Sequence, residues 1–204
     1  MKTAYFLLVG LLLAGCSAGP ATRDTPVTYD FGPQQADTGG AKTLRASVLL
    51  QSIAAPVWLD TPAIVYRLAY QDAARQQSYA NSRWATAPAS LLAQRLRSRL
   101  AAASEGGVVS GSDGARADYA LRVELEEFSQ VFDAADRSRG VVVARASLVN
   151  TAKRSLIAQR GFSVERAAGS ADADGGVRAL TAASSELIDA IIAWTATGIA
   201  QERK

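Results

Sequence analysis

Residues Tyr119–Glu126 read YALRVELE, and this stretch decides the fold. Apolar residues at 119, 121, 123 and 125 alternate with Ala, Arg, Glu and Glu. Alternation with a period of two is typical of a strand that buries one face and exposes the other. The next apolar residue, Phe128, follows Glu126 and Glu127 and breaks this parity, which predicts a β-bulge or bend near residue 127.

Other segments share this strand character. In residues 64–70 one face would carry Ile64, Tyr66, Leu68 and Tyr70, and Arg67 would lie on the other. Gln71–Ala73 is then expected to form a turn, and Asp133–Gly140 a polar hairpin loop. Further strands are expected at 44–53, 76–84, 141–150 and 156–164, with a turn at 151–155. The residues expected to face the core are Val142, Ala144, Ala146 and Leu148 in the third of these strands and Leu156, Ala158, Phe162 and Val164 in the last. Arg160 intrudes on the buried face of the last strand.

Two segments have helical periodicity. Pro88 is expected in the first turn of one helix, with Thr86 as its candidate N-cap, and the helix should end before Gly106. Its arginines fit a solvated face better than a site for anionic lipid headgroups. The second, C-terminal helix would be capped by Asp172 or Asp174. The apolar stripe of the first helix is Leu91, Leu92, Leu96, Leu100 and Ala103, and that of the second is Val177, Leu180, Ser184, Leu187, Ile188, Ile191, Trp194 and Thr195.

These elements predict an α+β fold, in which a single mixed or antiparallel sheet carries two amphipathic helices. No internal repeat and no second domain boundary is visible in the sequence. We expect one folded domain over residues 42–204, preceded by a leader at 1–15 and a linker at 16–41.

The leader consists of Lys2, an apolar run over residues 4–14, and small residues before Cys16. This layout is typical of a secretory signal peptide, and the run is too short for the roughly 20 residues that span a bilayer. Leu13, Ala14, Gly15 and Cys16 resemble the lipobox of bacterial lipoproteins. That resemblance implies cleavage before Cys16 and acyl chains, such as palmitate, on its thiol and amino group.

Cys16 is the only cysteine of the chain, and lipidation would explain an unpaired thiol in an exported protein. The alternative is a plain signal peptide with an incidental cysteine. Several acyl chains hold a protein firmly at a membrane without spanning it. Ser17 follows the cysteine where Asp usually signals retention in the inner membrane, so the resemblance implies an outer-membrane, lipid-anchored protein that faces the periplasm.

The linker is rich in Gly, Pro, Thr and Asp. Within it, Tyr29–Gly32 forms a small aromatic island with two alternative interpretations. It either docks on the domain as an edge strand or remains part of a loosely held linker.

The composition excludes several kinds of chemistry. The chain has no histidine, which rules out a Ser-His-Asp triad, a Cys-His pair and the commonest zinc ligand sets. Without residues 1–15 the charges are 21 basic against 19 acidic, or +2, and the arginines are scattered, which argues against nucleic-acid binding. Glu124, Glu126 and Glu127 form the only close carboxylate group, and we interpret it as a solvated sheet face.

No phosphate-binding, dinucleotide or calcium-loop motif is present in the sequence. We therefore expect no enzyme activity, no metal site and no cofactor apart from the covalent lipid on Cys16.

The chain resembles the ABC-type transport auxiliary lipoproteins, which include the PqiC-like proteins. The resemblance rests on the lipobox, the linker with Tyr29-Asp30-Phe31, the segment Trp58–Arg67 (WLDTPAIVYR), and the Tyr-rich strand that ends at Trp84 before Pro88. Arg160-Gly161-Phe162 and a helix that reaches Trp194 fit the same family. Phe31, where an aliphatic residue is expected, and the Gly/Ser-rich loop 106–114 depart from it.

The resemblance implies a non-catalytic accessory component of a lipid transport system, working with a membrane-anchored MCE-domain protein and an ABC transporter. Candidate partner-binding residues are Trp58, Leu59, Tyr66, Tyr70 and Trp84, and a homo-oligomer is an expectation by analogy. The alternative hypothesis is a structural envelope lipoprotein that supports cell-wall or secretion-complex assembly.

Overall fold

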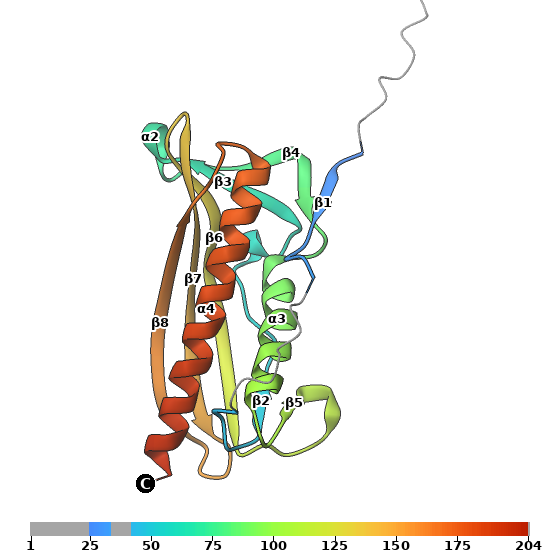
Figure 1. Cartoon of the computed structure of the whole chain (residues 1–204), viewed down its shortest axis with the longest axis vertical. Helices are drawn as coiled ribbons and strands as arrows, with labels where there is room; N and C mark the ends of the chain where they lie inside the picture. Colours follow the sequence, from blue (N-terminus) through green and yellow to red (C-terminus); the bar gives the residue numbers. More distant parts are fainter. Residues whose placement is uncertain (1–24, 34–41, 204) are drawn as a thin grey trace, which may run out of the picture.

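The computed structural model describes residues 25–33 and 42–203; the lipobox and the leader lie outside these residues. One eight-stranded mixed sheet carries two long helices, α3 and α4, side by side on one face (Figure 1), which confirms the predicted α+β class. The strands are β1 Val27–Tyr29, β2 Val48–Leu50, β3 Ala63–Leu68, β4 Gln76–Trp84, β5 Val108–Ser110, β6 Tyr119–Ala134, β7 Arg137–Asn150 and β8 Ser155–Ala167. The helices are α2 Ala69–Asp72, α3 Pro88–Ala103 and α4 Ala173–Glu202, and single 3-10 turns lie at Val57–Leu59 and Gly111–Asp113.

Strand β6 is the centre of the sheet. On one edge it pairs with β7, and β7 pairs with β8, in an antiparallel meander. On its other edge three successive segments pair with it in parallel: β2, the isolated bridge residue Ala54, and β3. Beyond β6 the sheet therefore forks into two branches, one of β3, β4 and β1 and the other of β2 and β5.

The alternation within β6 is as predicted, and so is the irregularity at its centre. Leu121, Val123 and Leu125 are buried, whereas Glu124 is exposed. The register with β7 shifts between Leu125 and Glu127, where the parity of the sequence breaks, and Phe128 is again buried.

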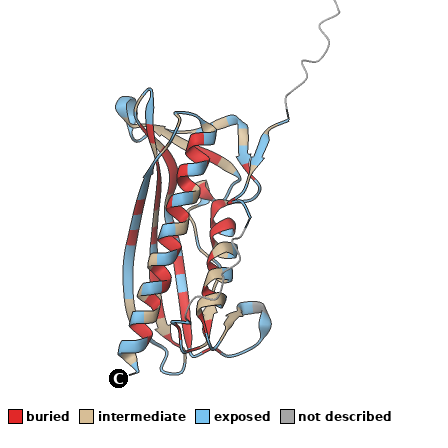
Figure 2. Ribbon diagram, in the orientation of Figure 1, coloured by how far each residue is buried: buried red, intermediate tan, exposed pale blue. Residues whose placement is uncertain are grey.

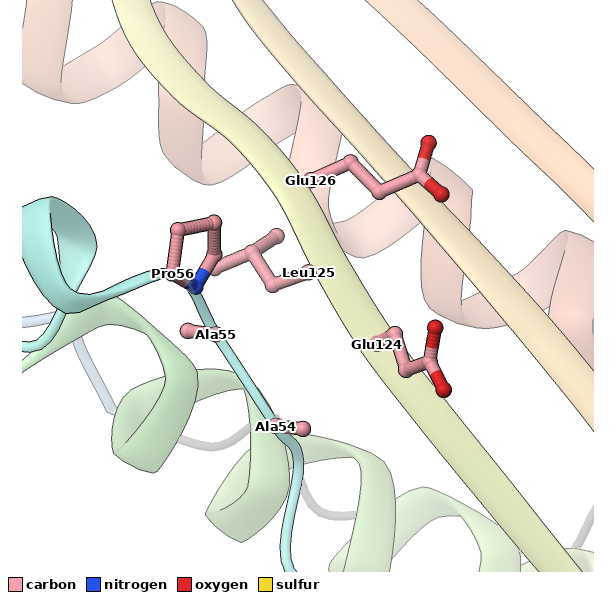
Figure 3. Close-up of a pocket in the computed structure, with 6 residues that line it drawn as sticks. All are labelled: Ala54, Ala55, Pro56, Glu124, Leu125 and Glu126. Carbon is pink, nitrogen blue, oxygen red and sulfur yellow. The ribbon is translucent and has the colours of Figure 1, made fainter.

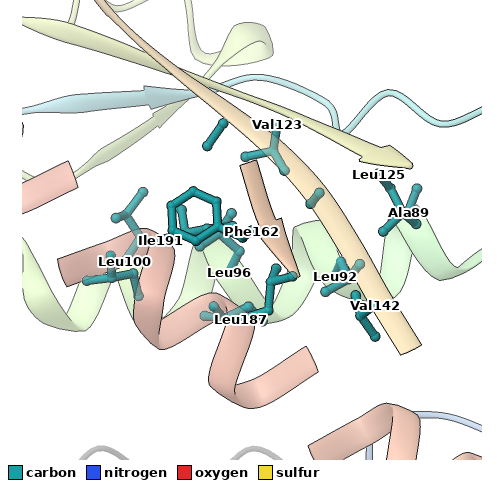
Figure 4. Close-up of a cluster of buried hydrophobic side chains, with 14 of the residues drawn as sticks. Ala89, Leu92, Leu96, Leu100, Val123, Leu125, Val142, Phe162, Leu187 and Ile191 are labelled. Atoms are coloured by element: carbon teal, nitrogen blue, oxygen red, sulfur yellow. The ribbon is translucent and has the colours of Figure 1, made fainter. Parts of the chain in front are cut away.

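The apolar faces of sheet and helices form one core (Figures 2 and 4). In α3, Leu92, Leu96 and Leu100 are at most 2 % exposed, as their helical spacing predicts. In α4 the stripe from Val177 to Thr195 is buried except for Trp194, which is half-buried. Asp172 caps α4 by accepting a hydrogen bond from the Gly175 amide at 2.8 Å. Thr86 does not cap α3: the N-cap position is Ala87, without a side-chain hydrogen bond.

Several predicted boundaries were wrong. The strand expected at 44–53 is reduced to Val48–Leu50, flanked by isolated bridges at Leu44 and Ala54. Gln71–Ala73 belongs to the single turn of helix α2 and its C-cap instead of a loop turn. The hairpin loop expected over 133–140 is only Ala135–Asp136, because β6 and β7 continue almost to their junction.

At the surface, the structure also differs from the prediction in two places. Leu156 was expected in the core but is 60 % exposed, because a register shift in β8 opposite Leu148 and Val149 turns it outward. Arg95 and Arg99 of α3 are not simply solvated: Arg95 donates to the Phe31 and Gly32 carbonyls, and Arg99 pairs with Asp189 of α4 at 2.6 Å.

Candidate functional site

The five aromatic and apolar residues proposed to bind a partner do not form one surface. Leu59 and Trp84 are each 1 % exposed and belong to the core. Trp58 and Tyr66 are half-buried, and Tyr70, on the single turn of α2, is 44 % exposed. In this fold Trp58, Tyr66 and Tyr70 remain accessible from outside.

Trp84 anchors the aromatic island at the N-terminal end of the described chain. Its ring meets Phe31 edge-on at a centroid distance of 5.8 Å and Phe128 at 5.6 Å. Phe31 is 7 % exposed, and the preceding β1 pairs in parallel with the end of β4. Of the two interpretations of the Tyr29–Gly32 island, docking as an edge strand is the one that the structure shows.

Tyr66 belongs to a cluster at the end of the sheet where α4 begins. Its ring lies 4.7 Å from Tyr79 and 5.8 Å from Phe132. The Tyr79 hydroxyl donates at 2.9 Å to Gln130, whose amide nitrogen in turn donates to Ser138 at 2.7 Å and to the Asp172 carbonyl at 3.1 Å. Burial, with smaller contributions from neighbouring Tyr66 and Asp172, raises the pKa of Tyr79 to about 12. This network fixes the start of α4 on the sheet.

Trp58 packs at the margin of the core and is linked through Arg67 to the bulge of β6. The Arg67 guanidinium lies 5.6 Å from the Trp58 ring centroid and contacts Glu127 at 3.3 Å. The Glu127 Oε1 atom is buried without a hydrogen-bond partner among the described residues. Arg67 therefore holds the indole and the carboxylate together at the point where β6 bends.

The carboxylate group singled out in the sequence borders a hollow of about 300 Å³ (Figure 3). Glu124 and Glu126 project to one side of β6, while Ala54–Pro56 runs along the other. Both glutamates are exposed, and Glu126 pairs with Arg145 of β7 at 2.7 Å. They lie side by side on one face and do not oppose each other across a cleft, as glycosidic chemistry would require.

A second hollow, of about 350 Å³, lies in the angle between β8 and α4. Its walls are Arg160, Phe162, Ala190, Ala193, Trp194 and Thr197. The Phe162 and Trp194 rings meet edge-on at 5.8 Å, and the Arg160 guanidinium lies 5.2 Å from the Phe162 ring centroid. The sequence placed Phe162 and Trp194 in the core and did not single out this hollow.

Sequence reasoning also missed Gln130, which is fully buried. A usable signal existed, because Gln130 stands between Phe128 and Phe132 on the buried face of β6. A polar side chain at such a position needs internal hydrogen-bond partners, and that requirement identifies a network.

In residues 25–33 and 42–203, no three His, Cys, Asp or Glu side chains gather closely enough to hold a metal ion. None of the helices in the same residues combines the length and the apolar character needed to cross a bilayer.

Comparison with known proteins identifies one matching family. Residues 29–192 match the family described as "ABC-type transport auxiliary lipoprotein component". A search of curated proteins returned no match.

Among solved structures, a Xanthomonas campestris protein of the DUF330 family is 18 % identical, with a TM-score of 0.76 over 87 % of this chain and 98 % of that one. An uncharacterized protein is 17 % identical, with a TM-score of 0.61 over 82 % and 97 % of the two chains. A hypothetical protein from Chlamydia trachomatis is 10 % identical, with a TM-score of 0.50 over 74 % and 96 %. At these identities the likeness concerns the fold alone.

Proposed function

The chain belongs to the ABC-type transport auxiliary lipoprotein family, and from this premise we propose that it is a non-catalytic, outer-membrane accessory component of an MCE-type lipid transport system. The observation that carries the proposal is the extent of the match. It begins at Tyr29 in β1 and ends at Ile192 in α4, so it includes all but the first residues of the sheet, the whole of α3 and α4 as far as Ile192. The auxiliary role therefore concerns the whole folded domain and not an appended segment.

The anchor in this proposal is lipid on Cys16, within the lipobox Leu13–Cys16. From Cys16 to Thr25 the chain can span at most about 32 Å, at roughly 3.6 Å for each of nine residues. The described chain enters the domain through β1, near the beginning of α4 and at the opposite end of the molecule from the end of α4 (Figure 1). The end of the domain that carries β1 and α2 would therefore face the outer membrane, and the other end would reach into the periplasm toward the partner's membrane.

The docking of β1 supports a fixed attachment. Tyr29 donates a hydrogen bond to Asp174 in the first turn of α4, and Phe31 is buried against Trp84. A tether that joins the domain through a buried aromatic residue defines which end is held at the membrane.

Two measurements test the proposal. The detergent-solubilised lipoprotein should retain the MCE-domain protein encoded with the same transport system, and deletion of its gene should disturb outer-membrane lipid asymmetry. Absence of that binding together with normal asymmetry contradicts the proposal. Capture of cell-wall or secretion-complex proteins, without any lipid phenotype, favours the structural envelope role.

Cys16→Ser tests the anchor separately. We expect the variant to leave the membrane fraction and to keep its leader, because the acylated cysteine is what the processing step would require. Unchanged outer-membrane fractionation contradicts lipidation at Cys16.

A further inference from the structure

Strand β8 is the long open edge of the sheet. Among the described residues this strand of 13 residues pairs with β7 alone, and it lies at the outer side of the sheet in Figure 1. The other edge strands, β1 and β5, have three residues each. A long exposed edge is a template for pairing with another chain unless something covers it.

The direction of the free backbone groups follows from the pairing with β7. The Ala168 amide donates to the Ser138 carbonyl at 2.9 Å, which marks these residues as a hydrogen-bonded pair. Because such pairs alternate along an antiparallel ladder, the backbone groups of Phe162 and Val164 point toward β7. Those of Gly161, Ser163 and Glu165 point away from it, toward open space.

Helix α4 and strand β8 together line a hollow beside this open edge. Ala190, Ala193, Trp194 and Thr197 recur at helical spacing and, with Phe162, line the hollow of about 350 Å³. Ala193 and Thr197 are exposed, and Trp194 is half-buried. One additional strand beside β8 would cover this stripe, in the way that β7 and β8 cover the neighbouring face of α4.

Arg160 adds a charge to the same site. Its guanidinium lies over the Phe162 ring, and among the described residues it makes no ion pair. The neighbouring charged residues of β8 are neutralised, since Glu165 pairs with Arg139 and Arg166 pairs with Glu186. The site therefore combines free backbone groups, an apolar hollow and one unneutralised cation.

We propose that an extended, acidic–apolar segment of the MCE-domain partner adds as a strand to the β8 edge, placing an apolar side chain over Ala193 and Trp194 and a carboxylate beside Arg160. This inference rests on the proposed function and names the contact surface for it. Strand addition takes affinity from backbone hydrogen bonds and specificity from alternate side-chain pockets, and β8 supplies both. The hollow at Glu124 and Glu126 is unsuitable for such a segment, because both edges of β6 are already paired there.

Matched variants of the full lipidated chain in detergent test this surface, with the purified periplasmic part of the MCE-domain protein as the probe. Ser163→Pro removes an outward amide at an edge position that tolerates proline, whereas Ser163→Thr keeps it. Ala193→Glu fills the hollow and places a carboxylate near Arg160, whereas Ala182→Glu makes the same change at an exposed position of α4 outside the hollow. Arg160→Glu reverses the charge, and Arg160→Lys keeps it.

We expect Ser163→Pro, Ala193→Glu and Arg160→Glu each to weaken binding at least about tenfold, and the three controls to remain within about threefold of the parent chain. Amides of β8 should also exchange more slowly when the probe is bound. If Ser163→Pro lowers the helix and strand signals in circular dichroism, the Ala193 pair decides the question, because both of its positions are exposed on a helix.

The failures can be told apart. Binding of the probe by the parent chain with unchanged affinity in all three variants overturns the β8 contact and leaves the proposed function standing. No binding by the parent chain overturns the β8 contact, and together with normal outer-membrane lipid asymmetry it also overturns the proposed function. If the variants instead change the sedimentation of the isolated chain without changing its affinity for the probe, the edge is occupied by a second copy, and the proposal is wrong.

Discussion

Gly140 of β7 lies so close to α4 that a Cβ atom built on it would be 2.7 Å from the backbone nitrogen of Leu180. It would also be 2.8 Å from the Ala179 carbonyl carbon, and neither atom belongs to a flexible side chain. The sequence suggested a loop glycine, but the residue permits direct contact between the backbones of the sheet and the helix.

Gly140→Ala should therefore destabilise the protein by about 1–3 kcal/mol, since the helix must move away from the sheet to accept one methyl group. Urea unfolding followed by circular dichroism measures the loss. Gly161→Ala is the matched control, because a Cβ there meets nothing within 4 Å. Because Ala is a better strand former than Gly, Gly161→Ala should cause no loss, and an equal loss at both positions would contradict the explanation by helix contact.

The raised pKa of Tyr79 predicts a loss of stability in alkali. Above the ordinary tyrosine pKa of 10 the unfolded chain releases the phenolic proton, while the folded chain retains it up to about 12. The unfolded state then binds fewer protons, so the free energy of unfolding should fall as the pH rises through this window. Tyr79→Phe should make the fall in the free energy of unfolding shallower. Part of the fall should remain, because the pKa values of Tyr29 and Tyr119 are also raised in the folded chain. An unchanged slope in Tyr79→Phe contradicts the assignment.

Phe31→Ala should release the N-terminal strand without unfolding the domain. It removes contacts with Trp84 and Phe128, which we expect to cost about 2 kcal/mol locally and to speed exchange of the amides around residues 25–33 about thirtyfold. Hydrogen exchange with mass spectrometry reads this segment directly. Val27→Ala, at a position that is 53 % exposed, should leave the exchange unchanged.

The Arg67–Glu127 contact should behave as a coupled pair. Arg67→Met leaves a partly buried carboxylate without its cation, and we expect a loss of about 2 kcal/mol in the free energy of unfolding. Adding Glu127→Gln should recover at least about half of that loss, which a double-mutant cycle measures.

The exposed pair of Arg145 and Glu126 provides the comparison. Its side chains are 49 % and 39 % exposed, so Arg145→Met should cost at most about 1 kcal/mol.

For the Arg67–Glu127 cycle, additive losses from Arg67→Met and Glu127→Gln would mean that the two side chains act independently.

The sequence predicts the parts of this fold that follow regular periodicity. The alternation in β6 and its break before Phe128 predicted both the strand and the bulge, and the helical stripes predicted which leucines of α3 face the core. Both signals are local, because burial of one face of a strand or helix fixes the spacing of its apolar residues, and this spacing can be read from a short stretch of sequence.

Other features depend on tertiary contacts that no local pattern encodes. Ser138 and Gly140 resemble loop residues, yet one accepts a hydrogen bond from buried Gln130 and the other touches α4. Leu156 fits the alternation of a buried face, but a shift of register turns it to solvent. Leu59 and Trp84 are large apolar residues, which made them candidates for partner binding, but tertiary packing places both in the core.

The parallel pairing of β2, Ala54 and β3 along one edge of β6 has a consequence for the proposed export of the chain. In the proposed export across the inner membrane, residues 42–84 emerge before Tyr119–Ala134. At that stage β2, Ala54 and β3 lack their shared partner β6, although β3 can already pair with β4. The antiparallel β3–β4 and β6–β7 pairs are local, the second closing through two residues, and can form quickly, while the parallel partners of β6 require long loop closures. Under the proposed export, we therefore expect the chain to remain accessible to periplasmic chaperones until its second half has crossed the membrane.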